Sequence, residues 1–326
     1  MKHTVRRSLV ASSLVFATAL GAGCAAPVDP DSAEAVDSTS QAIIDKEYVS
    51  NGGTIDLWYS SLAFCYLTGV TGNLDMQSPD VRVAGPEEVK LYVGADDRWH
   101  LQTSPAVTAT ARCSLWSDFR PVGAGRKVST YEGWTFGLEL TERHPGAHVE
   151  SPADWRRLWS GTSLCYLSGA LAGTLHGFDS AMAEVAVDRD ASGWYGRVSG
   201  TGRSVGGFWG IGSWWESQAP YGRAMCIDTG RSFKLEPAPG GTTTFRWRQG
   251  EPSNWMMPIS KGICMLTGMK GHFAGYGEAV RIHQENQHWK LDGASMQQGV
   301  SASAQCIPYN QLQLSGGFDV GGIKPL

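Results

Sequence analysis

The chain has 326 residues, of which 42% are hydrophobic, and this is enough for a sizeable core. Charged residues make up only 18%, against roughly 25% in an average soluble domain, whereas glycine contributes 41 residues. The net charge of −4 and the absence of basic runs argue against nucleic acid as a partner, because nucleic-acid binding needs clustered Lys and Arg. Low charge, frequent glycine and abundant Thr, Ser, Val and Trp favour short strands joined by tight turns over helices.

The N-terminus has the pattern of an export signal. Lys2, Arg6 and Arg7 precede an apolar run that ends at Leu20, too short to span a bilayer but typical of a signal-peptide core. The following Gly-Ala-Gly-Cys24 is similar to a bacterial lipobox, in which small residues precede a cysteine that receives a lipid. Here the usual leucine is displaced by one position, to Leu20. Residues 1–23 are therefore predicted to be a signal peptide.

Cysteine counting supports a lipid on Cys24. The chain has seven cysteines, six of which belong to repeated segments, so Cys24 is left over where a lipidated cysteine should stand. Residues 24–45 are acidic and carry no aromatic side chain, so they are expected to form a disordered tether. The alternative is ordinary secretion after cleavage at a nearby small-residue site.

A resemblance extends this prediction. The string Thr39-Ser40-Gln41-Ala42-Ile43, after an acidic tail, resembles exported bacterial lipoproteins of the myxobacterial type. That resemblance covers only about the first 43 residues and implies export rather than an activity. The expected location is the bacterial cell envelope, with the lipid bilayer as partner of the acyl anchor.

The rest of the chain is a threefold repeat. The first cysteines of the copies are 65, 165 and 264, and each opens a Cys-x-Leu-Thr/Ser-Gly string. A fixed period of about 100 residues indicates a repeat architecture. The units are residues 46–130, 131–240 and 241–326, and we refer to them as the first, second and third unit.

Each unit is expected to contain four strands. The glycine of the first string, with its freedom to adopt φ > 0, predicts that the first strand ends there at a turn. Alternating segments such as Val89–Val93 and Val280–Ile282 predict a second, half-buried strand. A polar turn then leads to a strand that opens on Trp99, Trp194 or Trp289, and the last strand alternates small residues up to the second cysteine. The small residues are expected to make room for the tryptophan.

The first and last strands of a unit each carry one cysteine. Because export favours disulfides, the expected bonds are Cys65–Cys113, Cys165–Cys226 and Cys264–Cys306, each closing a four-stranded element. The predicted fold is all-β, built from three disulfide-closed antiparallel units. These form either one pseudo-threefold body, which we favour, or three tandem small domains.

Two short motifs resemble a catalytic site and a calcium site, but the residues around them do not meet the requirements of such sites. Gly202-Arg-Ser204-Val-Gly206 matches a nucleophile elbow, but the glycine-rich sequence after it does not predict the helix that an elbow needs. Asp188-Arg-Asp190 resembles the start of a calcium loop, but Ser199 stands where the loop requires glutamate. We interpret the first as a chance match and the second as a hairpin turn.

Other polar clusters are incomplete too. Gln287-His-Trp289 is interpreted as part of a strand with a core tryptophan. The close histidine pairs are His144 with His148 and His283 with His288, and neither has further ligands that would complete a metal site. We therefore predict no metal and no cofactor.

The candidate binding site is an insertion in the second unit. The cysteines of that unit are 61 residues apart, against 48 and 42 in the others, and the extra residues lie between Gly200 and Gly222. An insertion that a repeat scaffold does not need is a common place for function. The predicted ligand-binding residues are Arg203, Phe208, Trp209, Trp214, Trp215 and Tyr221. The alternative is that these aromatic side chains pack on the repeat core.

These patterns favour a non-catalytic, lipid-anchored protein that binds a surface ligand such as a carbohydrate or another envelope component. The alternative is a structural or protein-interaction module of the cell envelope. A secreted hydrolase ranks third, because the sequence contains no paired carboxylates, complete triad or metal set.

Overall fold

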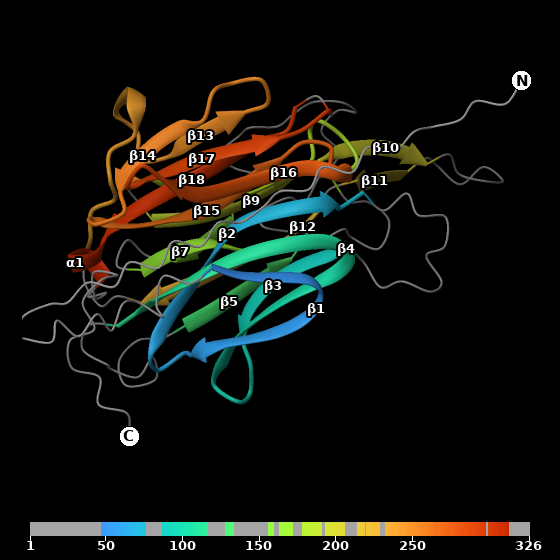
Figure 1. Ribbon diagram of the computed structural model, residues 1–326. Helices are drawn as coiled ribbons and strands as arrows, with labels where there is room; N and C mark the ends of the chain where they lie inside the picture. The colour runs from blue at the N-terminus through green and yellow to red at the C-terminus, as the bar shows by residue number, and fades with distance from the viewer. Residues whose placement is uncertain are drawn as a thin grey trace, which may run out of the picture. The chain divides into compact units, whose positions relative to one another are not determined.

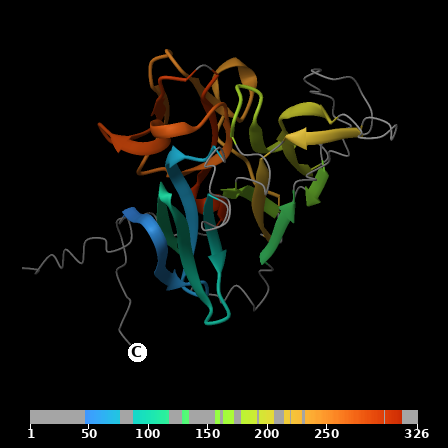
Figure 2. The ribbon, with the colours of Figure 1, turned by 90° about the vertical axis from the view of Figure 1, so that its right-hand side faces the viewer.

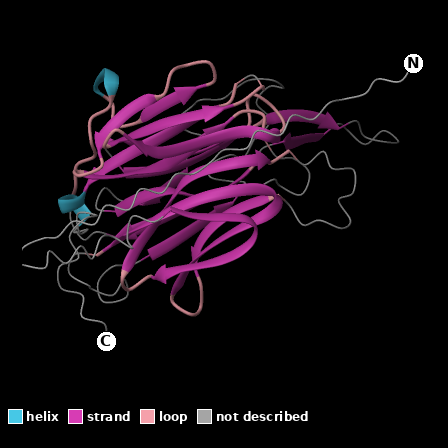
Figure 3. Cartoon of the chain, in the orientation of Figure 1, coloured by secondary structure: helices cyan, strands magenta, loops and turns pink. Residues whose placement is uncertain are grey.

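The computed structural model describes residues 47–75, 87–116, 128–133, 156–159, 163–171, 178–190, 193–205, 214–218, 220–228, 232–297 and 299–312. Strands dominate this part of the chain and pair antiparallel (Figure 3). The predicted all-β fold is confirmed. The signal peptide, Cys24 and the tether lie outside the described residues. No described helix is long and apolar enough to cross a membrane.

The elements follow one another as short segments along the chain. The first unit contains β1 (Glu47–Tyr59), β2 (Ala63–Asn73), β3 (Glu88–Val93) and β4 (Arg98–Leu115). Next come β5 (Val128–Gly133), β6 (Arg156–Trp159), β7 (Ser163–Leu171), β8 (Glu184–Asp190), β9 (Gly193–Ser199), β10 (Thr201–Val205), β11 (Trp214–Gln218) and β12 (Tyr221–Asp228). The last part contains the 3-10 turn η3 (Pro239–Gly241), β13 (Phe245–Arg248), β14 (Asn254–Pro258), β15 (Gly262–Lys270), β16 (Ala274–Glu285), β17 (His288–Ala294), β18 (Ser301–Pro308) and α1 (Tyr309–Leu312).

These strands form three sheets (Figure 1). A ten-stranded sheet has the order β14-β17-β16-β2-β4-β3-β7-β12-β5, with β1 paired to β4. A six-stranded sheet has the order β13-β18-β15-β8-β9-β6, and β10 and β11 pair by themselves. Seen from the side, the blue-to-cyan, green-to-yellow and orange-to-red strands gather in three groups (Figure 2).

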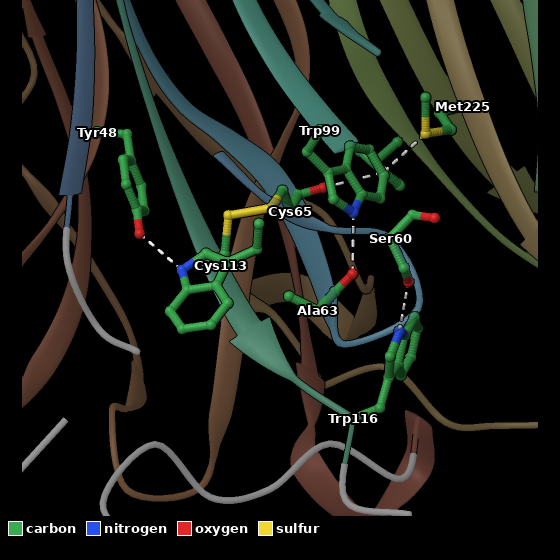
Figure 4. Close-up of a disulfide and its surroundings, with 10 residues drawn as sticks. Tyr48, Ser60, Ala63, Cys65, Trp99, Cys113, Trp116 and Met225 are labelled. Atoms are coloured by element: carbon green, nitrogen blue, oxygen red, sulfur yellow. Dashed lines mark hydrogen bonds between the residues drawn. A yellow bond between two sulfur atoms is a disulfide. The ribbon is translucent and has the colours of Figure 1, made fainter. Parts of the chain in front are cut away.

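Inside each unit, the strand that carries the first cysteine pairs with the strand that carries the second. Thus β2 pairs with β4, β7 with β12, and β15 with β18, and each time the two cysteines face each other directly across the strand pair. The disulfides are Cys65–Cys113, Cys165–Cys226 and Cys264–Cys306, as predicted (Figure 4 shows the first). All six cysteines are buried, so each bond lies in the core rather than on the surface.

The second strand pairs with a different unit, which the sequence analysis did not predict. Strand β3 pairs with β7, β8 with β15, and β16 with β2. The three junctions share one register, in which the glycine of the first strand faces the second strand of another unit: Gly69 faces Arg281, Gly169 faces Lys90 and Gly268 faces Ala186. The expectation that each disulfide closes a separate four-stranded element is therefore wrong, because the second strands complete sheets of neighbouring units.

Backbone hydrogen bonds join the three units in a ring. Phe178 N donates to Leu74 O at 3.0 Å, Leu74 N to Phe273 O at 2.9 Å, and Phe273 N to Phe178 O at 2.8 Å. All three side chains are buried, and the two phenyl rings meet edge to face at 5.4 Å. Because each residue belongs to a different unit, this ring ties together segments about 100 residues apart.

The glycine of the repeated string does not end its strand, contrary to the prediction. Strand β2 continues from Gly69 to Asn73, with a register shift between Leu67 and Gly69. The glycine is needed for close approach, since a Cβ on Gly69 would lie 2.6 Å from Thr110 Oγ1. A side chain there would collide with the adjacent strand, so the glycine allows the two strands to approach.

The repeated tryptophans belong to the core. Trp99, Trp194 and Trp289 are buried, which confirms the reading of Trp289 as a core residue. Trp99 Nε1 donates to Ala63 O at 2.9 Å (Figure 4), and Trp289 Nε1 donates to Gly262 O at 2.8 Å. In both units the acceptor lies two residues before the first cysteine, so the indole fixes the start of the first strand.

Tyr166 connects the second unit to the first. Its ring meets Phe64 edge to face at 5.2 Å, and its hydroxyl donates to Cys65 O at 3.0 Å. Burial raises the pKa of Tyr166 well above its ordinary value. The side chain is therefore neutral over the physiological range and remains a donor to the first disulfide strand.

Candidate functional site

A groove lies on one face of the six-stranded sheet, where a row of residues crosses five strands. Arg246 faces Ser303, Ser303 faces Gly268, Gly268 faces Ala186, and Ala186 faces Arg197. Residues directly opposite each other project from the same face of a sheet. The row therefore places three small residues between two arginines.

A second row runs beside the first, two residues further along each strand and so on the same face. In it Arg248 faces Ser301, Ser301 faces Lys270, Lys270 faces Glu184, and Glu184 faces Ser199. Except for Ser199, the residues of both rows line a groove of about 410 Å³, which Thr244, Gln249 and Asp188 also border. A second hollow of about 630 Å³ shares Asp188, Thr244 and Arg246 with the groove.

The acids of the groove have partners within it. Glu184 lies 2.5 Å from Arg197 and 3.6 Å from Lys270, measured between carboxylate oxygens and side-chain nitrogens. Asp188 accepts hydrogen bonds from Arg189 N at 2.8 Å and from Thr244 Oγ1 at 3.4 Å. Glu184 and its two cations therefore keep one positive charge in excess.

Arg246 and Arg248 differ from the acids of the groove in their exposure and in their partners. Both are exposed on the edge strand β13, and neither guanidinium makes an ion pair or hydrogen bond with a residue in the described part of the chain. Two acids lie near them: Asp188 lines the groove together with Arg246, and the Glu251 carboxylate accepts a hydrogen bond from Arg248 N at 3.2 Å. These two guanidinium groups are the groups of the groove best placed to meet a ligand.

In the sheet of the first unit, the equivalent row carries a long cationic side chain next to its glycine. Gly69 lies between Thr110 and Arg281, and Arg281 Nε donates to Asp292 Oδ1 at 2.7 Å. That hydrogen bond is the largest cause of the raised pKa of Arg281. The arginine over the glycine of this row is thus already engaged by a carboxylate of its own sheet.

The row that crosses the second unit also carries long side chains next to its glycine. Gly169 lies between Arg223 and Lys90, so two long cationic side chains flank the glycine. In the six-stranded sheet Ser303 and Ala186 occupy those two positions. The groove thus arises because Ser303 and Ala186 are small. In each of the other two rows, at least one of the two equivalent positions carries a long cationic side chain.

The predicted insertion forms a hairpin of its own. Strand β10 pairs with β11, so that Arg203 faces Glu216, Ser204 faces Trp215, and Val205 faces Trp214. Tyr221 opens β12, and Phe208 and Trp209 lie outside the described residues. The described backbone keeps this hairpin separate from the groove strands in sheet pairing, and the binding role of its aromatic residues stays a prediction.

The other motifs identified in the sequence do not form functional sites among the described residues. Ser204 lies inside β10, not at the strand-to-helix turn that a nucleophile elbow requires. Asp188 and Asp190 end β8 in a hairpin with β9, as interpreted. His283 lies 3.6 Å from Asp292, while His144 and His148 fall outside the described residues. Within the described ranges, no group of three or more His, Cys, Asp and Glu side chains could hold a metal ion.

The groove could not be predicted from the sequence. Its residues come from five strands of two units, and no short motif contains them. The available signal was the pair of small residues at positions 186 and 303, where each of the other copies carries at least one long cationic side chain. That signal becomes readable only when the pairing between units is known.

Fold and groove define an all-β, disulfide-bonded protein with a polar groove on a sheet face. No protein-family model matches the chain, and no curated protein matches it.

Proposed function

We propose that this chain is a non-catalytic binding protein of the bacterial cell surface, which takes a saccharide in the groove of the six-stranded sheet. The observation that carries this proposal is the groove itself, where the serines and glycine of the floor leave room beside two guanidinium groups that have no partner among the described residues. Three disulfides suit an oxidising compartment outside the cytoplasm.

The groove offers the groups that sugar hydroxyls need. Ser301 and Ser303 carry hydroxyls that can donate, and the amide oxygen of Gln249 can accept, whereas the Thr244 hydroxyl already donates to Asp188 and accepts from Gln305. The arginines add several donors in a fixed plane. A sugar ring presents hydroxyls around its edge, so it could pair with several of these groups at once.

The hairpin β10–β11 is a second contact surface in this proposal. Its tryptophans would stack on sugar rings, as exposed aromatic side chains can. The alternative, a structural or protein-interaction module, would use the same hairpin to anchor another envelope protein. A hydrolase ranks below both.

A glycan array probed with the full chain in detergent tests the proposal. We expect a defined set of glycans to bind, and Trp209→Ala or Trp214→Ala to weaken binding about tenfold, the effect of losing a binding hot spot. The melting temperature of these variants should stay unchanged. A large drop in melting temperature would instead make the hairpin aromatics part of the core, and an array without any bound glycan would favour the interaction module.

Membrane anchoring by Cys24 belongs to the same proposal. We expect the native protein to partition into detergent, and the Cys24→Ser variant to remain in the aqueous phase, because the acyl chains would be missing. Mass spectrometry of the mature N-terminus provides the measurement. A native N-terminus that begins after residue 24 would show ordinary secretion instead.

We also propose that the three units form one pseudo-threefold body rather than three tandem domains. The shared register at the junctions and the ring of Leu74, Phe178 and Phe273 support this arrangement. A single body would hold the five strands of the groove in a fixed relation, as a binding site requires.

A further inference from the structure

We infer that the groove selects an acidic saccharide, one that carries a carboxylate or sulfate group, over a neutral one. This inference rests on the proposed function and names the class of its ligand. It is drawn from the charges of the groove and from the way the row through Gly268 differs from the other two.

The lining is cationic although the protein is acidic. Four cations and two acids line the groove, while the whole chain has a formal charge of −4. Glu184 with Arg197 and Lys270 leaves one positive charge, and Arg246 and Arg248 together with Asp188 leave another, so the lining carries an excess of two positive charges. Glu251 offsets part of it near Arg248.

The two arginines are placed to act together. They are two residues apart on β13, so their side chains leave the same face about 7 Å apart along the strand. A guanidinium binds a planar acid group through two parallel N–H donors, which an ammonium group does less well. The edge position of β13 leaves both groups accessible from the side of the sheet.

Neighbouring hydroxyls favour a sugar acid over a simple anion. Ser303 lies directly across from Arg246, and Ser301 directly across from Arg248. Each cation therefore has a hydroxyl one strand away, about 5 Å in the direction of the groove floor. An acid group on the arginine would place the ring hydroxyls of the same sugar over these serines and over Gly268.

The two arginines differ from Arg281 in their partners within the described part of the chain. Arg281 in the first row is neutralised by Asp292 of its own sheet. In the six-stranded sheet Arg246 and Arg248 have no such carboxylate among the described residues. A cation that the fold does not neutralise is available for a ligand that carries the opposite charge.

Calorimetric titration of the full chain in detergent tests the inference with three probes: trigalacturonate, a neutral trisaccharide of galactose, and a sulfated disaccharide. We expect at least one acidic probe to bind about tenfold or more tightly than the neutral one, with affinity falling as salt is added. The stronger of the two acidic probes identifies carboxylate or sulfate as the group recognised. Arg246→Gln and Arg248→Gln should each weaken that binding about tenfold.

Two further variants keep the result interpretable. Lys261→Gln removes one positive charge from an exposed position that does not line the groove, so its affinity should equal that of the wild type. Ser303→Arg should abolish binding without lowering the melting temperature, because Arg223 occupies the equivalent position in the second unit.

Equal affinity for neutral and acidic probes would overturn the inference and leave the proposed function standing. Unchanged acidic binding in both arginine variants would overturn it as well. If neither these probes nor a broad glycan array showed any binding, the proposed function would fall together with the inference.

Discussion

Replacing Trp99 or Trp289 by alanine is expected to lower the free energy of unfolding by about 3–5 kcal/mol. Both indoles are fully buried, and each removal leaves a large cavity and an unpaired buried carbonyl. Chemical denaturation followed by circular dichroism measures the change. As a control, Trp255→Ala should cost about 1 kcal/mol or less, since Trp255 is 47% exposed on the edge strand β14.

Phenylalanine variants separate the hydrogen bond from the packing. Trp99→Phe and Trp289→Phe leave Ala63 O and Gly262 O without their donors, which costs about 1–3 kcal/mol beyond the lost ring area. Trp194 is equally buried, but its Nε1 has no hydrogen-bond partner in the described part of the chain. Trp194→Phe should therefore be the mildest of the three, and equal losses at all three positions would assign the effect to packing alone.

Removal of one disulfide is expected to cost about 4 kcal/mol by the loop-entropy relation. The loops closed by the three bonds span 48, 61 and 42 residues, so the three values should lie close together. Double serine variants of each pair, measured by thermal unfolding, test this expectation. Cys24→Ser provides the matched control, since Cys24 belongs to none of the three bonds.

The result distinguishes two ways in which the units are organised. If the three units form one body, loss of the Cys165–Cys226 bond should lower a single, common unfolding transition. If the units are independent domains, that loss should split off a separate transition for the second unit and leave the others at their original temperature. The second outcome would contradict the pseudo-threefold body.

The disulfide framework could be predicted because each unit carries one cysteine on its first strand and one on its last. Antiparallel pairing of those strands brings Cys65 opposite Cys113, and the same holds in the other units. The period-two pattern around Leu91 likewise predicted a half-buried strand, and the structure confirms it. These features depend on contacts within one unit, for which spacing and alternation are sufficient signals.

The role of Gly69 could not be predicted in this way. Glycine in a short string suggests a turn, but the structure uses it where strands from two units approach each other. The residue that faces it, Arg281, is about 210 residues away in sequence. A local pattern carries no information about such a partner.

By itself, the sequence determined the all-β class, the three disulfides and the burial of the repeated tryptophans Trp99, Trp194 and Trp289, because each follows from hydrophobic alternation and paired cysteines inside a unit. Only the tertiary structure decided that second strands pair with other units and that Arg246, Ser303, Gly268, Ala186 and Arg197 share one row. The physical reason is that a sheet face is assembled from hydrogen-bonded neighbours, and here those neighbours come from segments up to about 100 residues apart. The groove therefore depends on long-range pairing, whereas the scaffold around it depends on patterns that a single unit contains.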